Sequence, residues 1–322
     1  MKDQTFATLT GVALPRLELA ATELQAGRGF SEVRIPKRRG GWRTTLRPTP
    51  SLDIVLTSVR NALSMLYKAP ACVHGYVRGR DTTSNATPHC GQKVVLRVDL
   101  EDFFDTITPE LVSSACMTYG LDAEAASLIA ALSCPRGRLA AGFPCSPVLS
   151  NMVFSGTDEH LMDWSNLHHL TYTRYADDLV FSGDLIGDEH LLELSALLQG
   201  DGWHVNNGKT RFMRKGKAQF VTGLYAGLPD RPRIPRRLKR SLRLQLHYLK
   251  EHGYEDCHGR APWTPGSRQV WGLIHYIRRL EPDLAQDLAE TARSIDFQLP
   301  QRIGVDDEWD ALLEDLGVPE DF

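Results

Sequence analysis

The six cysteines of this 322-residue chain form no Cys-x-x-Cys pair and are spread widely along the sequence. This spacing suggests neither a disulfide framework nor a structural zinc site. Cys257 is followed by His258, but two neighbouring ligands fall short of the four that structural zinc usually takes. All six cysteines are therefore predicted to be reduced thiols.

Long hydrophobic stretches are also lacking, since no apolar run approaches the roughly 20 residues that cross a bilayer. The N-terminal Met1-Lys2-Asp3-Gln4 has no signal-peptide core. A hydrophobic content of 42% and a charged content of 24% are ordinary for a globular protein. These features predict a cytoplasmic protein without a membrane partner, folded as one domain or as two to three subdomains.

The net charge of −3 is small, but it is distributed unevenly. Residues 201–250 carry +11, residues 281–322 carry −11, and the first 280 residues together carry +8. A basic body with an acidic end is the better description. Basic stretches of this density favour contacts with phosphate, and a solvated charged face is the alternative.

The first structural elements predicted by the pattern are a strand and a helix. Residues 42–46 are β-prone and follow a basic Gly-Gly turn, and two prolines at 48 and 50 end that strand. Ser51 is then predicted to cap a helix. The apolar residues that recur at helical spacing in it are Ile54, Val55, Val59, Leu63 and Leu66.

Two further strand signals bring carboxylates to strand ends. Residues 93–100 are Val-rich and predict a buried strand ending at Asp99. Thr108 followed by Pro109 predicts the start of a helix. Residues 170–182 are rich in strand formers on both sides of Ala176-Asp177-Asp178, a pattern typical of a hairpin with two carboxylates at its tip.

The pattern changes to helical after Pro235, where four leucines recur every three or four residues among arginines and lysines. A second helix is predicted for residues 270–280, and the acidic end follows. A centre of strands and helices with a late helical section indicates an α+β fold with a separate C-terminal subdomain.

Two adjacent carboxylates repel each other unless a cation lies between them. Magnesium prefers octahedral oxygen ligands and often shares them with phosphates. With Asp99 as a third carboxylate, Asp177 and Asp178 are suited to a two-metal site, where one ion activates a hydroxyl and the other stabilises the leaving group. An ordinary solvated turn is the alternative for the Asp-Asp pair alone.

Four segments resemble motifs of reverse transcriptases, in the family's order and spacing. Residues 98–104 (VDLEDFF) resemble the first catalytic motif, and residues 141–151 (AGFPCSPVLSN) resemble the QGxxxSPxLSN motif. Tyr175-Ala176-Asp177-Asp178 resembles the YxDD signature, and Asn207-Gly208-Lys209-Thr210 resembles the NxxKT element. The resemblance covers roughly residues 30–280.

The resemblance implies a right-hand polymerase architecture with fingers, palm and helical thumb. The palm would combine an antiparallel sheet with helices. The expected divisions are 1–95 for the N-terminal region and fingers, 96–230 for the palm, and 231–322 for the thumb and acidic tail. It also implies RNA-directed DNA polymerase activity with two Mg²⁺ ions and deoxynucleoside triphosphates. The implied metal ligands are Asp99, Leu100, Asp177 and Asp178.

The resemblance also suggests which residues contact the incoming nucleotide. Phe104 would be the gate that excludes a 2′-hydroxyl, with a core aromatic as the alternative, and Arg43 would grip the triphosphate through its planar guanidinium. Lys209 would protonate or steady the pyrophosphate, and an ordinary salt-bridging lysine is the alternative. The further nucleotide-contacting candidates are Lys37, Arg38, Leu100 and Gly142.

Ala141 departs from the family pattern, which has Gln at this position. In the family that Gln contacts the incoming nucleotide and helps to couple selection to the template. The substitution leaves the chemistry in place and puts ordinary templating in question.

Three shorter elements resemble bacterial retron reverse transcriptases: residues 74–80 (HGYVRGR), Asn85-Ala86-Thr87-Pro88-His89 (NAxxH) and Val221-Thr222-Gly223 (VTG). The retron family implies a structured non-coding RNA as partner, priming from a guanosine 2′-hydroxyl, a branched RNA–DNA product, and an effector protein restrained in anti-phage defence. RNA recognition through phosphates would suit the basic helix. The nucleic-acid-binding candidates are Asn85, His89, Arg236, Arg237, Lys239, Arg240 and Arg243.

Two alternatives to the retron enzyme remain open. One is another bacterial defence reverse transcriptase that makes unusual or weakly templated DNA, which Ala141 motivates. The other is a non-catalytic RNA-binding scaffold, which has no need for three converging carboxylates. The acidic end, residues 281–322, is interpreted as a solvated tail, a cover for basic surface or an effector docking site, with a short amphipathic helix near Trp309, Leu312, Leu313 and Leu316.

Overall fold

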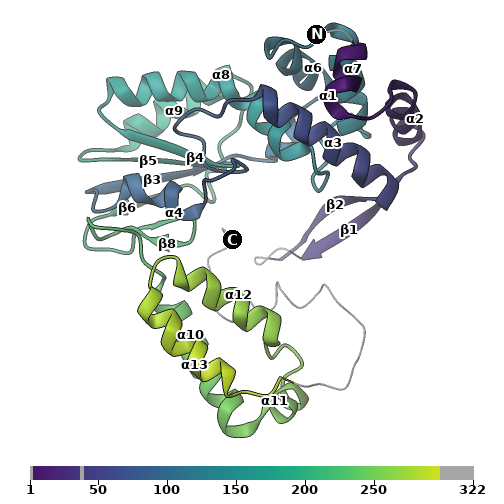
Figure 1. Cartoon of the computed structure of the whole chain (residues 1–322). Coiled ribbons are helices and arrows are strands. Elements are labelled where there is room, and N and C mark those ends of the chain that lie inside the picture. The colour runs from purple at the N-terminus through teal and green to yellow at the C-terminus, as the bar shows by residue number, and fades with distance from the viewer. Residues whose placement is uncertain (1–2, 37–39, 298–322) are drawn as a thin grey trace. The chain divides into compact units, whose positions relative to one another are not determined.

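In the computed structural model of the chain, residues 3–36 and 40–297 are described (Figure 1). They divide into two compact units. The first holds the described residues up to Asn85 together with Lys93–Met213, and the second holds Ala86–Gln92 and the described residues from Arg214 onward. Lys37, Arg38 and the predicted helix near Trp309 lie outside the described residues.

The first unit combines helices with a sheet and a separate two-stranded hairpin. Its helices are α1 (Asp3–Thr10), α2 (Leu14–Gln25), α3 (Pro50–Leu66), α4 (Thr82–Ala86), α5 (Phe103–Thr106), α6 (Pro109–Thr118), α7 (Ala123–Ser133), α8 (Ser146–Leu167) and α9 (Asp188–Gly200). Its strands are β1 (Phe30–Pro36), β2 (Trp42–Pro48), β3 (Val94–Asp99), β4 (Thr171–Tyr175), β5 (Asp178–Gly183) and β6 (Arg211–Arg214).

The main sheet has the strand order β4-β5-β3-β6, and β5 pairs antiparallel with both β3 and β4. Helices α8 and α9 lie on one side of this sheet (Figure 1). β5 is buried along its whole length, which explains why its sequence is almost continuously apolar after Asp178. Behind the sheet end, Phe103, Phe154 and Trp203 pack their rings together, and the Trp203 indole donates to Thr157 at 3.0 Å.

Most of the predicted elements are confirmed. The strand at 93–100 is β3, the hairpin at 170–182 is β4 and β5, and Thr108 caps α6 by accepting from the Leu111 amide at 3.4 Å. The predicted cap at Ser51 is wrong, because α3 already begins at Pro50 and its N-cap is Thr49, two residues before Ser51. Ile54 is exposed rather than buried in this helix. The residues that α3 buries are Leu52, Val55, Leu56, Val59, Ala62 and Leu63.

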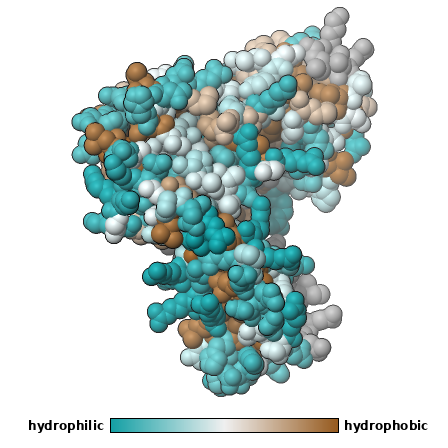
Figure 2. Space-filling model, turned by 60° about the vertical axis from the view of Figure 1, so that its left-hand side comes forward, coloured by the Kyte–Doolittle hydropathy of each residue, from teal (hydrophilic) through white to brown (hydrophobic). Residues whose placement is uncertain are grey.

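The second unit is mainly helical. Its elements are η1 (Thr87–His89), β7 (Phe220–Val221), β8 (Leu224–Tyr225), α10 (Arg236–His252), α11 (Tyr254–Arg260), α12 (Ser267–Arg278) and α13 (Pro282–Arg293). The predicted helices after Pro235 and at 270–280 are confirmed as α10 and α12. On the face drawn in Figure 2, the surface of these helices is mostly hydrophilic.

The start of the acidic end is folded, because α13 packs against α10 and α12. It buries Ala285, Leu288, Ala289 and Ala292 at helical spacing, so this part is not a solvated tail. No helix among residues 3–36 and 40–297 is long and apolar enough to cross a membrane.

Candidate active site

Two of the three predicted metal-binding aspartates face each other across neighbouring strands. Asp99, the last residue of β3, is paired in register with Asp178, the first residue of β5. Asp177 lies in the two-residue turn before Asp178, and its carbonyl accepts the Leu100 amide at 3.2 Å. Residues opposite each other on an antiparallel pair have Cβ atoms about 5 Å apart. The structure therefore brings the three aspartates together at one end of the sheet.

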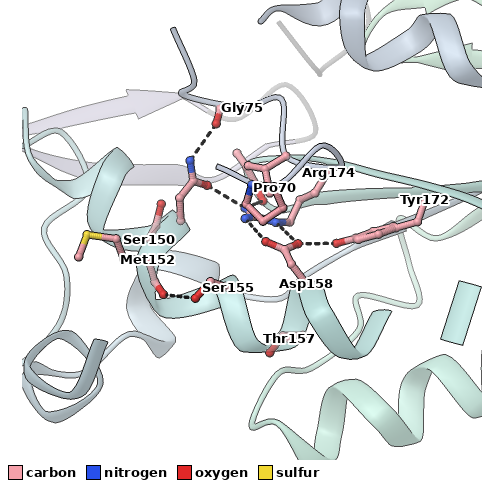
Figure 3. Close-up of polar contacts among 12 residues, drawn as sticks. Pro70, Gly75, Ser150, Met152, Ser155, Thr157, Asp158, Tyr172 and Arg174 are labelled. Atoms are coloured by element: carbon pink, nitrogen blue, oxygen red, sulfur yellow. Dashed lines mark hydrogen bonds and ion pairs between the residues drawn. The ribbon is translucent and has the colours of Figure 1, made fainter. Parts of the chain in front are cut away.

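The turn between β4 and β5 is held by a buried ionic network (Figure 3). Ala176 has φ +57°, which is unfavourable for a residue other than glycine. The Arg174 guanidinium donates to the Ala176 carbonyl at 3.1 Å and to the Asn151 side-chain oxygen at 3.0 Å. Asp158 on α8 accepts from Arg174 at 2.6 Å and from the Tyr172 hydroxyl at 2.8 Å. The network fixes the backbone that carries Asp177.

Both charges of this ion pair are completely shielded, since the side chains of Arg174 and Asp158 are 0% exposed. Burial alone would lower the pKa of Arg174, but the Asp158 carboxylate more than offsets that effect and holds the pKa above its usual range. The guanidinium also lies over the Phe154 ring, 4.6 Å from its centroid. Arg174 is therefore always charged, and its guanidinium contacts Asp158, Asn151, the Ala176 carbonyl and the Phe154 ring.

The carboxylates at the tip of the hairpin repel one another, as expected for a site that binds a cation. Burial raises the pKa of Asp177, and the nearby Asp99 carboxylate raises it further. The Lys209 ammonium lies 3.3 Å from Asp99, and Arg97 donates to Asp178 at 2.6 Å. These two cations partly balance the negative charge of the aspartates, and both also act to lower the pKa of Asp177.

The turn that carries Lys209 is tied to the backbone of Asp99. The Asn206 amide donates to the Asp99 carbonyl at 2.8 Å, and the Asn206 carbonyl accepts from the amides of Lys209 and Thr210. Lys209 is half-exposed, so its ammonium is paired with Asp99 and also accessible to a ligand. Both interpretations made from the sequence, a pyrophosphate contact and a salt-bridging lysine, agree with this position.

Among residues 3–36 and 40–297, no three His, Cys, Asp or Glu side chains form a ready-made cluster for a metal ion. The donor types nevertheless suit magnesium, because three aspartates lie at adjoining strand ends and the charge of Asp99 disfavours ionisation of Asp177. A divalent cation would relieve that repulsion. Leu100 has a buried apolar side chain, so only its backbone carbonyl could serve as a ligand.

The predicted nucleotide-contacting residues differ in their exposure to solvent and in their packing. Arg43 is exposed on β2, opposite Ile35 of β1. Phe104 is half-buried on α5, with its ring against Phe103. Gly142 has φ +102°, and a Cβ there would lie 2.6 Å from the Leu46 carbonyl. This close approach explains why glycine is needed and attaches the 141–151 motif to β2.

Ala141 takes part in the same contact through its backbone, because its carbonyl accepts the Leu46 amide at 2.8 Å. Leu46 lies three residues after Arg43 on β2. The position where the family has Gln is therefore next to the strand that carries the predicted triphosphate contact. The methyl side chain of Ala141 has no polar group to offer a base.

Asn85 and His89 are not presented as surface contacts, since both side chains are 0% exposed. Direct nucleic-acid binding by these two side chains is therefore not supported, and the sequence pattern reflects interior positions. Gly91, just after His89, donates its amide to the Ala226 carbonyl at 2.8 Å. Gln219 donates to the Gln92 carbonyl at 3.0 Å. The segment after NAxxH is thus bonded to both sides of the VTG turn.

The basic helix α10 presents most of its predicted contacts to solvent. Arg236, Arg237, Arg240 and Arg243 are exposed, while four leucines of the opposite face are buried. Lys239 differs, because its ammonium lies 2.9 Å from Glu281 and is only partly exposed. The acidic end therefore neutralises one lysine of α10, and the four arginines remain the accessible cations among the predicted set.

Sequence reasoning missed Arg97, Asp158 and the supporting role of Asn151. The available signal was a charged residue, Arg174, inside the predicted strand that leads to the Asp177 turn. A buried charge requires a partner, but its identity depends on α8 lying against β4, which the sequence pattern does not reveal.

Comparison with known families agrees with this arrangement. Residues 35–249 match the model of the reverse transcriptase (RNA-dependent DNA polymerase) family. Because this match covers more than half of the chain, the chain belongs to the reverse transcriptase family. The α+β right-hand fold predicted from the sequence is confirmed by this membership.

The curated relatives are retron reverse transcriptases, which confirms the narrower resemblance. Retron Mx65 reverse transcriptase of Myxococcus xanthus is 32% identical over 285 residues, covering 81% of this chain and 64% of its own length. Retron Mx162 reverse transcriptase of the same organism is 30% identical, and this chain likewise spans 64% of it. Retron Ec86 reverse transcriptase of Escherichia coli is 27% identical, with 91% of this chain and 93% of the relative covered.

Among solved structures, a telomerase from Candida albicans aligns over 81% of this chain and 56% of its own at 12% identity. Its TM-score of 0.45 is too low to bear on the fold or the function.

Proposed function

We propose that this protein is an RNA-directed DNA polymerase of the retron type. It copies part of a structured non-coding RNA into a branched RNA–DNA product and acts in anti-phage defence with an effector protein. The observation that carries the catalytic part is the pairing of Asp99 with Asp178 beside Asp177 at the end of β3 and β5. The similarity to retron reverse transcriptases supports an RNA template as the partner.

The aspartates Asp99, Asp177 and Asp178, with the Leu100 carbonyl, would hold two magnesium ions. When bound, such ions activate a hydroxyl nucleophile and stabilise the leaving pyrophosphate. Lys209, already oriented by its turn, neutralises charge on the phosphates. Arg43 binds the triphosphate from β2, and Phe104 lies under the sugar and disfavours a 2′-hydroxyl.

The proposed subdomains are those that the family resemblance implies. Residues 1–95 act as the N-terminal region and fingers, 96–230 as the palm, and 231–322 as the thumb with the acidic tail. The four exposed arginines of α10 follow the nucleic-acid backbone, since guanidinium groups bind phosphate oxygens in a bidentate manner.

The decisive experiment uses the protein purified with its bound RNA. Adding Mg²⁺ and deoxynucleotides should produce DNA of one defined sequence, joined to the RNA and resistant to RNase only in its DNA part. Debranching enzyme should release the DNA if the junction is a 2′,5′ linkage. Absence of DNA synthesis by the wild-type protein with RNA bound would reject the polymerase in favour of an RNA-binding scaffold.

A second candidate function is a defence reverse transcriptase that makes unusual or weakly templated DNA. Ala141 favours it, because no side-chain amide is present where the family contacts the incoming nucleotide. Sequencing the product separates the two: a unique copied segment supports the retron type, and a repetitive or template-independent product supports the alternative. Ala141→Gln should then raise the accuracy of nucleotide selection.

A further inference from the structure

The segment from Cys72 to Tyr76 forms an additional edge beside the catalytic hairpin. Val73 makes a parallel bridge with Arg174 on β4, the Arg174 amide donates to the Cys72 carbonyl at 2.7 Å, and the His74 amide donates to the Arg174 carbonyl at 2.8 Å. The segment therefore continues the sheet on the side of β4 that is away from β5. It ends at Tyr76, next to the turn that carries Asp177.

Close contacts hold the end of this segment against the turn. A Cβ on Gly75 would lie only 2.4 Å from the Ala176 amide nitrogen, so glycine alone fits there. The Asn151 side chain donates to the Gly75 carbonyl at 3.0 Å, and the same side chain accepts from Arg174 (Figure 3). One buried network thus fixes both the Asp177 turn and the backbone before Tyr76.

Tyr76 itself combines two unfavourable features. Its φ of +62° lies in the left-handed region, where a bulky residue is rare. Its aromatic side chain is 48% exposed, so the strain is not explained by burial of the ring in the core. Strained residues that persist in a well-determined framework cluster at functional sites.

The surroundings of the ring locate it at the catalytic end of the unit. The pKa of the Tyr76 phenol is raised to about 12, mainly by partial burial and then by the charge of Asp177, while the charges of Arg174 and Arg43 act in the opposite direction. Lys209 lies near β3 and β6, on the other side of the three aspartates. In an in-line displacement the attacking primer hydroxyl and the leaving pyrophosphate lie on opposite sides of the reacting phosphorus, so a primer end would lie on the side of the carboxylates away from Lys209.

We propose that Tyr76 is a nucleic-acid-binding residue that packs its exposed ring against the template–primer duplex beside the catalytic aspartates. This proposal rests on the proposed polymerase function. Aromatic faces bind bases and sugars without regard to sequence, as a polymerase requires. The Gly75–Asn151–Arg174 contacts hold the backbone in the conformation that points the ring outward.

The test separates the ring from the strained backbone. Tyr76→Gly removes the ring and suits a positive φ, Tyr76→Phe keeps the ring, and Leu167→Ala removes an exposed apolar side chain at the end of α8 as a matched control. Affinity for a fluorescent RNA-template/DNA-primer duplex is measured by anisotropy without nucleotides, and thermal melting is recorded for each variant.

Tyr76→Gly is expected to bind the duplex about tenfold more weakly, within the range for loss of one stacking aromatic, with no fall in melting temperature. Tyr76→Phe and Leu167→Ala should stay within about twofold of wild type, since neither removes the stacking ring. Wild-type affinity in Tyr76→Gly, or weaker binding accompanied by a lower melting temperature, would overturn the proposal. A rise in KM for deoxynucleotide with unchanged duplex affinity would overturn it too.

The proposed polymerase is judged by a different readout. A wild-type protein that binds the duplex but makes no DNA contradicts the polymerase and leaves the comparison of Tyr76 variants valid. DNA synthesis by the wild type together with unchanged duplex binding by Tyr76→Gly contradicts only the role of Tyr76.

Discussion

The catalytic hairpin of the first unit and the basic helix α10 of the second both depend on charged side chains, in opposite ways. At the hairpin, Arg174 and Asp158 are fully buried, and each has several specific partners. On α10 the arginines are exposed and the leucines supply the packing. Charge at the hairpin holds the backbone in place, while charge on α10 is proposed to bind nucleic acid, so substitutions in the two regions should affect different measurements.

The largest effect is expected from Asp99→Asn, which removes one of the three converging carboxylates. Loss of a metal ligand at a two-metal site should lower the rate of single-nucleotide incorporation by roughly a thousandfold or more. Rapid-quench measurement with bound RNA gives this rate. The matched control is Asp105→Asn, which changes an exposed carboxylate on α5. An equal loss of rate in this control would contradict a specific role of Asp99 as a metal ligand.

Breaking the buried ion pair should have the next largest effect, on stability as well as activity. Arg174→Met leaves the Asp158 carboxylate without its cation and should lower the free energy of unfolding by about 3–5 kcal/mol. Urea denaturation measures this change. Adding Asp158→Leu should restore part of the stability, because replacing both charges is less costly than removing one.

The exposed ion pair Lys93–Asp184 is the control for the buried pair Arg174–Asp158. Its side chains are 61% and 74% exposed, so Lys93→Met should have little effect on unfolding. A loss as large as that of Arg174→Met would contradict the contrast between buried and exposed charge.

A pH dependence should arise next to the hairpin at His74, whose Nδ1 lies 2.8 Å from the Ser84 hydroxyl. Burial lowers the pKa of His74 to about 4, below its usual value of 6.5. Between these values the unfolded chain binds a proton that the folded protein does not. Stability present above pH 6.5 is therefore lost as the pH falls toward 4, by about 1–3 kcal/mol.

The measurement is urea unfolding at pH 7.5 and pH 5 for wild type and His74→Asn. The amide can still bond to Ser84 and does not titrate, so the variant should lose less stability than wild type between the two pH values. The same loss in both proteins would show that His74 does not contribute.

The smallest single effects are expected on α10. Arg240→Gln should weaken RNA binding a few-fold and reduce the slope of log affinity against log salt by about 0.7–0.9, since one phosphate contact is lost. Lys239→Gln is the internal control, because its ammonium is already paired with Glu281. Equal changes in salt dependence for the two variants would show that this ion pair opens when RNA binds.

The contrast between the hairpin and α10 also explains which parts of the fold and the site could be predicted from the sequence. The Val-rich β3, the hairpin around Asp177 and the leucine stripe of α10 follow from local patterns, and all three are confirmed. The partners of Arg174 could not be predicted, because Asp158 and Asn151 meet it only when α8 packs against β4. Asn85 and His89 look like polar contacts in sequence, yet both are buried.

Helix α13 has an apolar stripe in its sequence that is easily overlooked among its many acidic residues. Ala285, Leu288, Ala289 and Ala292 recur at helical spacing, yet the strongly acidic composition left three interpretations open: a solvated tail, a cover for basic surface and an effector docking site. Three alanines and one leucine form a weak stripe on their own. Packing against α10 and α12, together with the Glu281–Lys239 pair, gives this segment its place.

The central claim is that the Asp177 turn is the catalytic centre of a DNA polymerase. The most direct measurement is DNA synthesis on the co-purified RNA by wild type and Asp177→Asn, with bound RNA and melting temperature recorded for both. We predict a defined DNA product from the wild type and none from Asp177→Asn, with RNA binding and folding unchanged. Equal DNA synthesis by the two proteins would contradict the account.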